Sequence, residues 1–164
     1  MYEKPTLLVD SREKLPLDFD GCDDFKDIKY IRISEGDYSL EGLEHIVSIE
    51  RKSSPDELYQ NLSTKAKKKR LFAEAERLRT KVKYRFIIVE ASLAEVTDPM
   101  SYYINKTGRN KYSKMMPPIV VMNNLIEFMT KYGIFVIFAD KYNMKFIVKK
   151  ILLNIYKEHS ACSK

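Results

Sequence analysis

The sequence contains few of the residues that build zinc sites, disulfide frameworks or cysteine-based active sites. Its 164 residues include two cysteines, two histidines and no tryptophan. Cys22 and Cys162 lie at opposite ends of the chain, so they form no CxxC pair. A zinc site, a disulfide framework and a Cys/His catalytic pair are therefore all poorly supported.

Long apolar runs are missing as well. No stretch approaches the roughly 20 apolar residues that span a bilayer, and residues 1–5 lack the apolar segment of a secretory signal. We therefore expect an intracellular protein that does not enter a membrane. Hydrophobic residues make up 45% and charged residues 32% of the chain, with no repeat or linker. Residues 1–164 are expected to form a single domain with its own core.

Charge is distributed unevenly along the chain, whose net charge is +6. Residues 1–64 contain 8 Lys/Arg and 15 Asp/Glu, which gives a net charge of −7. Residues 65–164 contain 21 Lys/Arg and 8 Asp/Glu, which gives a net charge of +13. Acidic residues of the first part could hold cations, while basic residues of the second could neutralise a polyanion. A merely solvated charged surface explains the same composition equally well.

Hydrophobic patterning predicts the secondary structure. In the first half, strands are expected over 6–9, 30–33, 38–40 and 45–52, the last two as a hairpin. In the second half, the expected elements are a helix from Ser54-Pro55, a helix over 67–80, a strand over 86–90, a helix over 117–132, a strand over 134–138 and a helix over 144–155. Early antiparallel strands followed by alternating helices and strands predict an α/β fold, with a mixed β-sheet flanked by helices on both faces.

The helix over 117–132 has a pattern of its own. Ile119, Met122, Ile126 and Met129 recur on one face, and Gly133 is expected to end the helix.

Three side chains of the first half form a chemical group. Asp37 follows Gly36 at the start of a strand, and Glu50 and Lys52 lie two residues apart on the next strand, so their side chains share a face. Arg51 should point to the opposite, apolar face. Two carboxylates on paired strands suit Mg²⁺ or Mn²⁺. A neighbouring lysine could orient or deprotonate an attacking water and offset charge on a phosphate.

The wider pattern resembles a known family. Val9-Asp10-Ser11-Arg12-Glu13, Gly36-Asp37 and Ile49-Glu50-Arg51-Lys52-x-x-x-Asp56 occur in that order. They resemble V-D-x-R-E, G-D and E-R-K-x-x-x-D, the signature of the XPF family of structure-selective endonucleases. The resemblance covers about residues 6–158. It implies a restriction-endonuclease-like fold whose central hairpin holds the active site.

The resemblance also implies roles for individual residues. Asp37 and Glu50 would bind the metal, Mg²⁺ or Mn²⁺, together with Asp10, and Lys52 would assist the attacking water. Glu13 would support this acidic cluster, although a partly solvated loop acid explains it nearly as well.

Arg51 and Asp56 also occupy signature positions. The resemblance implies that Arg51 belongs to the catalytic group and that Asp56 supports it. An ion pair at the edge of the core, with Asp56 as one candidate partner, explains Arg51 equally well.

Two basic segments are candidate DNA-binding surfaces. Residues 65–85 contain ten Lys/Arg and two Glu, which suits phosphate binding. The candidates in this segment are Lys67, Lys68, Lys69, Arg70 and Arg77. Residues 102–114 interleave three tyrosines with basic residues, which suits stacking on unpaired bases, although an ordinary surface loop explains them equally well. The candidates here are Lys106, Arg109 and Lys111.

The sequence therefore predicts a Mg²⁺- or Mn²⁺-dependent endodeoxyribonuclease that hydrolyses phosphodiester bonds at branched, flap or single-strand/duplex junction DNA in repair or recombination. The alternative is a non-catalytic DNA-binding or scaffold subunit that pairs with another nuclease. Helix-hairpin-helix and helicase domains, which accompany many members of the family, have no counterpart in these residues. Family members work as dimers, so a homodimer or a partner protein is expected. The apolar residues proposed for that interface are Met122, Met129, Tyr132, Phe146 and Tyr156.

Overall fold

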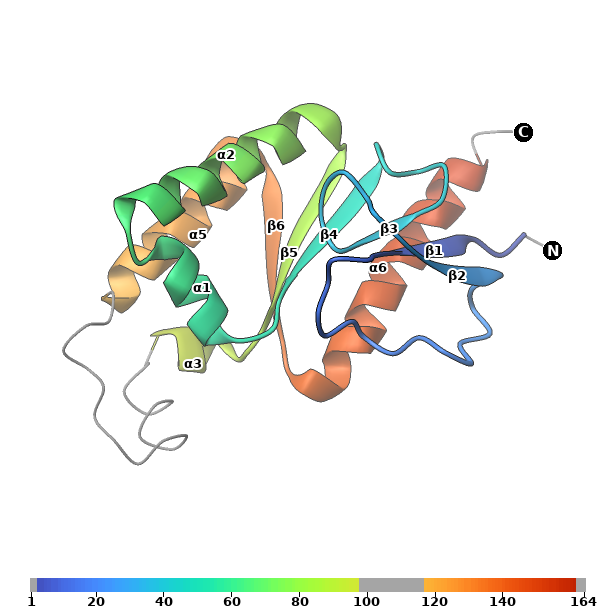
Figure 1. The fold of residues 1–164 in the computed structure, drawn as a ribbon, viewed down its shortest axis with the longest axis horizontal. Helices are drawn as coiled ribbons and strands as arrows, with labels where there is room; N and C mark the ends of the chain where they lie inside the picture. The colour runs from blue at the N-terminus through green and yellow to red at the C-terminus, as the bar shows by residue number, and fades with distance from the viewer. Residues whose placement is uncertain (1–2, 98–116, 162–164) are drawn as a thin grey trace.

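The computed structural model describes residues 3–97 and 117–161, which form one six-stranded sheet with helices on both faces (Figure 1). The strands are β1 (Thr6–Asp10), β2 (Asp27–Ile31), β3 (Tyr38–Leu40), β4 (Val47–Lys52), β5 (Tyr84–Glu90) and β6 (Ile134–Ala139). The helices are α1 (Pro55–Leu62), α2 (Lys65–Lys81), α3 (Leu93–Thr97), α5 (Pro118–Tyr132) and α6 (Lys141–Ala161). None of the helices in the described ranges is long and apolar enough to cross a membrane.

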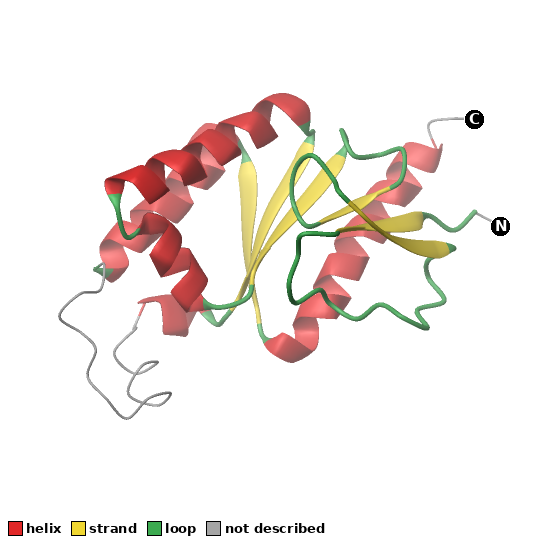
Figure 2. Cartoon of the chain, in the orientation of Figure 1, coloured by secondary structure: helices red, strands yellow, loops and turns green. Residues whose placement is uncertain are grey.

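The sheet is mixed, as the sequence predicts. Its strand order is β2-β1-β3-β4-β5-β6, with β3 antiparallel to β1 and β4, and with β4, β5 and β6 mutually parallel. The expected hairpin is the β3–β4 pair at the centre of the sheet (Figure 2). β4 is therefore the strand at which the sheet changes from antiparallel to parallel pairing.

Each face of the sheet has its own hydrophobic core. One core lies under α1, α2 and α5 and includes Ile87 and Val89 of β5. The other lies under α6 and includes Val47 and Ile49 of β4. Because side chains alternate along a strand, Ser48, Glu50 and Lys52 of β4 face α1 and α2 instead. The site is thus built on the face that the basic helix covers.

One expectation from the sequence is wrong in detail. The second strand spans Asp27–Ile31 instead of 30–33, and it pairs parallel to β1, with Thr6 opposite Asp27. It is an edge strand on which Tyr30 and Ile31 remain exposed, so it has little of the apolar alternation that identifies a half-buried strand.

Most of the apolar stripe on one face of α5 points outwards, whereas its Met122 packs against the core. Ile119, Ile126 and Met129 are exposed, whereas Val121, Leu125, Phe128 and Tyr132 form the buried face. Both sets recur at helical spacing, and packing against the sheet selects the second. The predicted end of the helix is confirmed, because Gly133 adopts a left-handed conformation with φ of 60°.

Candidate active site

The turn before β3 requires a glycine. Gly36 has φ of 78°, and a Cβ at this position would lie 2.2 Å from Oγ of Ser48 and 3.0 Å from the carbonyl oxygen of Ile49. No side chain fits so close to the neighbouring strand. The glycine therefore brings residue 37 directly against β4.

Three backbone hydrogen bonds hold Asp37 in place. Its N–H donates to the carbonyl of Ile49 at 2.8 Å, and its carbonyl accepts from the N–H of Asp10, also at 2.8 Å. The N–H of Arg51 donates to Oδ2 of the Asp37 carboxylate at 2.7 Å. Strands β1 and β4 thus fix both the main chain and the side chain of Asp37.

Glu50 and Lys52 form an ion pair on the same face of β4. Nζ of Lys52 lies 2.7 Å from Oε1 of Glu50 and 3.4 Å from Oε1 of Glu57 in the first turn of α1. The Lys52 side chain is only 7% exposed, so both carboxylates compensate a buried charge. Glu57 also accepts a hydrogen bond from the N–H of Ser53, which ties the start of α1 to the end of β4.

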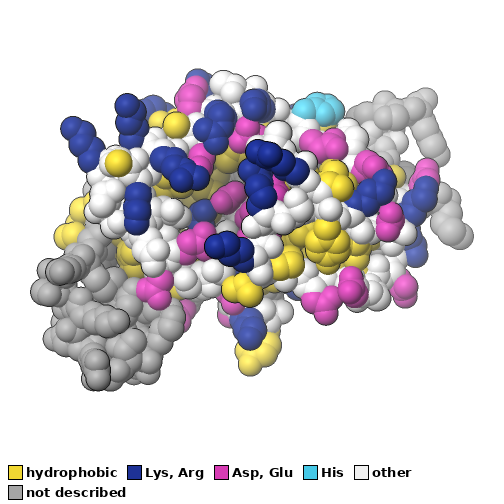
Figure 3. Space-filling view, viewed as in Figure 1, with side chains coloured by type: hydrophobic (Ala, Val, Ile, Leu, Met, Phe, Trp, Pro, Cys, Tyr) yellow, Lys and Arg dark blue, Asp and Glu magenta, His cyan; other side chains and the backbone are white. Residues whose placement is uncertain are grey.

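Asp37 and Glu50 line one cavity of about 270 Å³ between the 34–37 turn and α2. Asp10 and Arg12 lie on its β1 side, and Arg77 lies on its α2 side. Figure 3 shows this face of the molecule, with acidic side chains in a central hollow and Lys and Arg side chains around it. A second cavity continues along Glu50 towards the start of α2. The arrangement is that of an acidic floor with a basic rim.

The surroundings of Asp37 disfavour its ionised form. Burial and the nearby charge of Glu50 raise the pKa of Asp37 to about 8, although the hydrogen bond from the Arg51 N–H opposes the shift. Burial alone would lower the pKa of Lys52, but Glu50, Glu57 and Asp37 outweigh it and raise that pKa above its usual value. Lys52 is therefore an ammonium ion at neutral pH.

Asp10 lines the cavity, but its carboxylate is already hydrogen-bonded to Arg12. It is 2% exposed, and both of its carboxylate oxygens accept hydrogen bonds from Arg12, the shortest at 2.5 Å. The bonds from Arg12 hold the pKa of Asp10 below its usual value. Arg12 also donates to the carbonyl of Ile33 and is 56% exposed on its other side. In this arrangement Asp10 orients Arg12 at the rim of the cavity.

The side chain of Arg51 lies on the opposite face of the sheet, as expected from the alternation. It forms a buried ion pair with Glu90 at the end of β5, donates to the carbonyl of Leu15 at 2.6 Å, and lies 3.9 Å from Glu13. The suggested ion pair is thus present, with Glu90 and Glu13 as the carboxylates. Asp56 lies in the first turn of α1. Neither Arg51 nor Asp56 lines the two cavities at Glu50.

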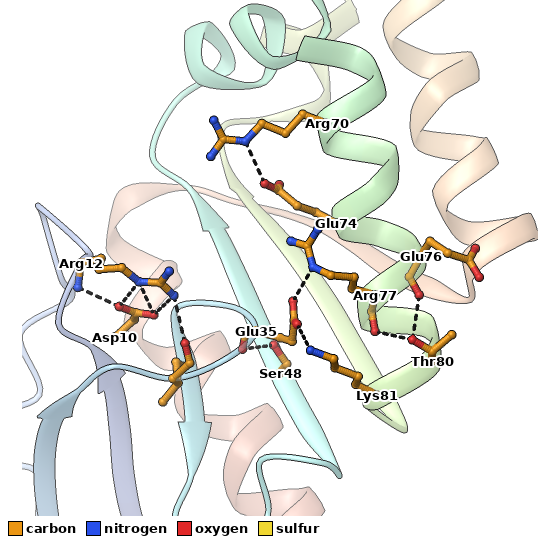
Figure 4. Close-up of polar contacts among 11 residues, drawn as sticks. Asp10, Arg12, Glu35, Ser48, Arg70, Glu74, Glu76, Arg77, Thr80 and Lys81 are labelled. Atoms are coloured by element: carbon orange, nitrogen blue, oxygen red, sulfur yellow. Dashed lines mark hydrogen bonds and ion pairs between the residues drawn. The ribbon is translucent and has the colours of Figure 1, made fainter. Parts of the chain in front are cut away.

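The basic residues of α2 differ in their relation to the site. Arg77 lines the first cavity, and Lys67 and Arg70 line the second with Lys52 and Glu57. Lys69 is exposed on the helix, and Nζ of Lys68 lies 5.3 Å from the centre of the Phe72 ring. The side chains at 70, 74, 77 and 81 follow one face of α2 (Figure 4). The candidates Lys106, Arg109 and Lys111 lie outside the described residues.

Several residues of the site carry no recognisable sequence signal. Glu57, Glu90 and Glu35 meet Lys52, Arg51 and the α2 cations only through tertiary contacts. Arg12 has a signal, because it stands in the Val9–Glu13 motif, yet it was not among the expected site residues. Among the described residues no group of three or more His, Cys, Asp or Glu could hold a metal ion.

The mixed sheet, its central hairpin and the helices on both faces define an α/β domain. The structure is similar to XPF from Aeropyrum pernix, with a TM-score of 0.64 and 19% identity over 93% of this chain and 65% of that one. It is also similar to XPF from Aeropyrum pernix in complex with DNA, with a TM-score of 0.60 and 19% identity over 94% of this chain and 66% of that one. This chain thus spans about two thirds of the length of those proteins. No curated protein matches the sequence.

Residues 9–145 match the ERCC4 domain, so the chain belongs to the ERCC4 domain family. It is an XPF-type nuclease domain by family and by fold.

Proposed function

We propose that the chain is a Mg²⁺- or Mn²⁺-dependent DNA endonuclease that cuts branched, flap or junction DNA. The observation that carries the proposal is that Asp37 and Glu50 line one cavity with a basic rim, and that Glu50 and the Lys52 ammonium, which form an ion pair, line the cavity that continues from it. The similar XPF structure is a complex with DNA, which supports DNA as the polyanion. The ERCC4 match over most of the chain supports nuclease chemistry.

The donor set fits a hard divalent cation. Asp37 and Glu50 each keep a carboxylate oxygen, Oδ1 and Oε2, that has no hydrogen bond among the described residues. Mg²⁺ is often held by one or two carboxylates, with waters and substrate phosphates completing its shell. Burial and the nearby charge of Glu50 raise the pKa of Asp37, and a bound cation would favour its ionised form. Asp10 could join the set only if Arg12 released its carboxylate.

The metal ion, when bound, would polarise the phosphodiester and lower the pKa of an attacking water. The side chains then have separate tasks. Asp37 and Glu50 would hold the ion, and Lys52 would stabilise negative charge that develops on the phosphate. The ion pairs of Lys52 keep it protonated, which favours this electrostatic task over removal of a proton from water.

Basic side chains around the cavity would bind the DNA backbone. Arg12 and Arg77 stand on opposite sides of the carboxylates, and Lys67 and Arg70 continue the basic surface along α2. Phosphate contacts of this kind are independent of base sequence and weaken with salt. They therefore suit an enzyme that recognises DNA shape.

The proposal is tested by incubating the purified protein with Mn²⁺ or Mg²⁺ and labelled flap, fork, single-stranded and duplex DNA. Metal-dependent cuts that EDTA stops, with a preference for branched substrates, are expected. Asp37→Asn serves as the matched inactive protein. Binding of DNA without any cleavage would contradict the proposal and favour the non-catalytic scaffold instead.

We further propose that the chain pairs with a second copy through the β6 edge of the sheet. Exposed apolar side chains lie on all three elements at this edge, namely Met129 on α5, Phe135 on β6 and Phe146 on α6. Such a surface is typical of a protein interface. Tyr132 is instead buried in the core under α1, α2 and α5, against which Met122 packs, and Tyr156 packs against the core under α6. Light scattering at micromolar concentration should give a dimer that Phe135→Lys dissociates, and a strictly monomeric wild type would contradict this.

A further inference from the structure

Glu35 joins the catalytic turn to two other elements. Its carbonyl accepts a hydrogen bond from Oγ of Ser48 on β4 at 2.9 Å. Its carboxylate lies 2.7 Å from Nζ of Lys81 and 3.6 Å from Nε of Arg77, both on α2 (Figure 4). The Glu35 side chain is only 8% exposed. One residue therefore ties the turn that presents Asp37 to the strand beneath it and to the basic helix above it.

The contact leaves most of Arg77 available. Nε of its guanidinium lies 3.6 Å from Glu35, and among the described residues the two Nη groups have no hydrogen-bond partner. Arg77 is 50% exposed and lines the cavity of Asp37 and Glu50. An arginine held at Nε can still present its paired Nη donors to phosphate oxygens.

The opposite side of the cavity repeats this arrangement. Asp10, 2% exposed, binds Arg12, which is 56% exposed and lines the same cavity. Glu35, 8% exposed, binds Arg77, which is 50% exposed. In each pair a buried carboxylate restricts an arginine whose outer side faces solvent. The two arginines therefore stand as oriented cations on the two sides of the carboxylates.

We propose that Glu35 is a positioning residue, which holds α2 against the catalytic turn and orients Arg77 to bind a phosphate of the DNA strand beside the reaction site. The inference rests on the proposed nuclease function. Glu35 also neutralises Lys81 and part of Arg77, so it weakens the general attraction of α2 for DNA. Glu35 therefore favours the geometry that cleavage needs and lowers the affinity for DNA.

This dual effect provides the test. Glu35→Gln keeps the size of the side chain and removes its charge. Its DNA affinity, measured in EDTA, should rise, and the slope of log K against log salt should steepen by up to about 1 for each cation released. The single-turnover cleavage rate in Mn²⁺ should fall at least about tenfold, because Arg77 is no longer oriented. A purely structural residue would lower affinity and rate together.

Glu76→Gln is the matched control. Glu76 lies on the same helix and pairs with Arg79, away from the two cavities. This variant makes the same change in net charge, so its affinity should rise slightly and its cleavage rate should equal that of the wild type. Thermal denaturation of all variants establishes the temperature at which each is fully folded.

A double variant checks that Glu35 acts through Arg77. Arg77→Lys keeps the charge but lacks the paired Nη donors, so it should lower the cleavage rate with little loss of affinity. Glu35→Gln combined with Arg77→Lys should then cut no more slowly than the slower single variant. Additive losses would overturn the proposal, as would a Glu35→Gln protein with wild-type rate and affinity.

The two proposals fail separately. A wild-type protein that cuts no DNA contradicts the nuclease function. The DNA affinity of Glu35→Gln and its dependence on salt then still test whether Glu35 holds Arg77 and Lys81. A steeper slope and tighter binding support its hold on Arg77 and Lys81, whereas unchanged values overturn it.

Discussion

Arg51 contacts Asp37 through its main chain and Glu90 through its side chain, on opposite faces of the sheet. The N–H of Arg51 donates to Oδ2 of Asp37 at 2.7 Å, while its guanidinium forms a buried ion pair with Glu90. Any residue with a backbone N–H could make the first contact. The arginine side chain is therefore needed for the stability of the ends of β4 and β5 and of the loop at Leu15, to whose carbonyl it also donates.

Arg51→Met should accordingly destabilise the protein by about 3–5 kcal/mol, because it leaves Glu90 and Glu13 without their cation in a largely buried place. Urea denaturation measures the loss. Arg79→Met, which breaks an exposed pair with Glu76, should have a much smaller effect. An Arg51→Met protein as stable as the wild type would show that the buried pair contributes nothing.

Two turn glycines allow the cost of close approach to a neighbouring strand to be measured apart from the cost of backbone strain. Gly36 and Gly42 have φ of 78° and 77°, but a Cβ at Gly42 meets nothing within 4 Å. Each change to alanine carries the cost of a left-handed residue, about 1–2 kcal/mol. Gly36→Ala should cost clearly more than Gly42→Ala in urea denaturation, since it must also push the turn away from Ser48. Equal costs would mean that the turn yields easily.

Asp37→Asn and Glu50→Gln should each abolish cleavage, by about a hundredfold or more, while leaving DNA binding largely intact. Each change removes the charge of a proposed metal ligand and keeps the shape of the side chain. Single-turnover rates in Mn²⁺ and binding in EDTA measure the two properties. Cleavage by either variant at the wild-type rate would remove that residue from the metal site.

The stability of the metal-free protein should depend on pH through Asp37. Its folded-state pKa of about 8 lies above the ordinary value of 3.8, so between these values the folded protein binds more protons than the unfolded chain. The free energy of unfolding therefore falls as pH rises from about 4 to about 8.

Asp37→Asn lacks this titration. In EDTA its Tm should match that of the wild type near pH 4 and exceed it by about 3 °C or more at pH 8. Mn²⁺ added at pH 8 should raise the Tm of the wild type more than that of the variant. The same pH dependence of Tm in both proteins would show that Asp37 ionises normally.

Lys52→Met should lower the rate of cleavage about a hundredfold with little change in DNA affinity, because the charge that Lys52 would stabilise exists mainly in the transition state. Lys29→Met is the control, since Lys29 also pairs with a glutamate, Glu41, but on an exposed surface. A Lys52→Met protein with normal turnover and weaker binding would make Lys52 an ordinary phosphate contact.

The motif residues could be predicted from the sequence because their spacing fixes their geometry. Glu50 and Lys52 share a face of β4 because side chains alternate along a strand, and the glycine before Asp37 predicts a turn. The partners of these residues could not be predicted in the same way. Glu35 and Glu57 are ordinary glutamates until the fold brings α2 and α1 beside them.

The error at β2 and the burial of α5, which the sequence did not decide, have a common physical origin. On α5, the set with Ile126 and the set with Leu125 satisfy helical spacing equally well, and only the position of the sheet decides which is buried. On β2, the polar pattern of an edge strand gave no periodic signal, and its parallel pairing to β1 depends on how the 11–26 connection returns. Local patterns identify elements, whereas burial and pairing are decided by tertiary contacts.

The change from antiparallel to parallel pairing at β4 affects how the site should open and close. Residues 35–81 form the turn, β3, β4, α1 and α2 in chain order. The Glu35–Lys81 ion pair joins the two ends of this segment. Most of the site is therefore one nearly continuous segment of chain. Such segments tend to open as cooperative units, so hydrogen exchange should give one common free energy of opening for the amides of the turn, β4 and α2.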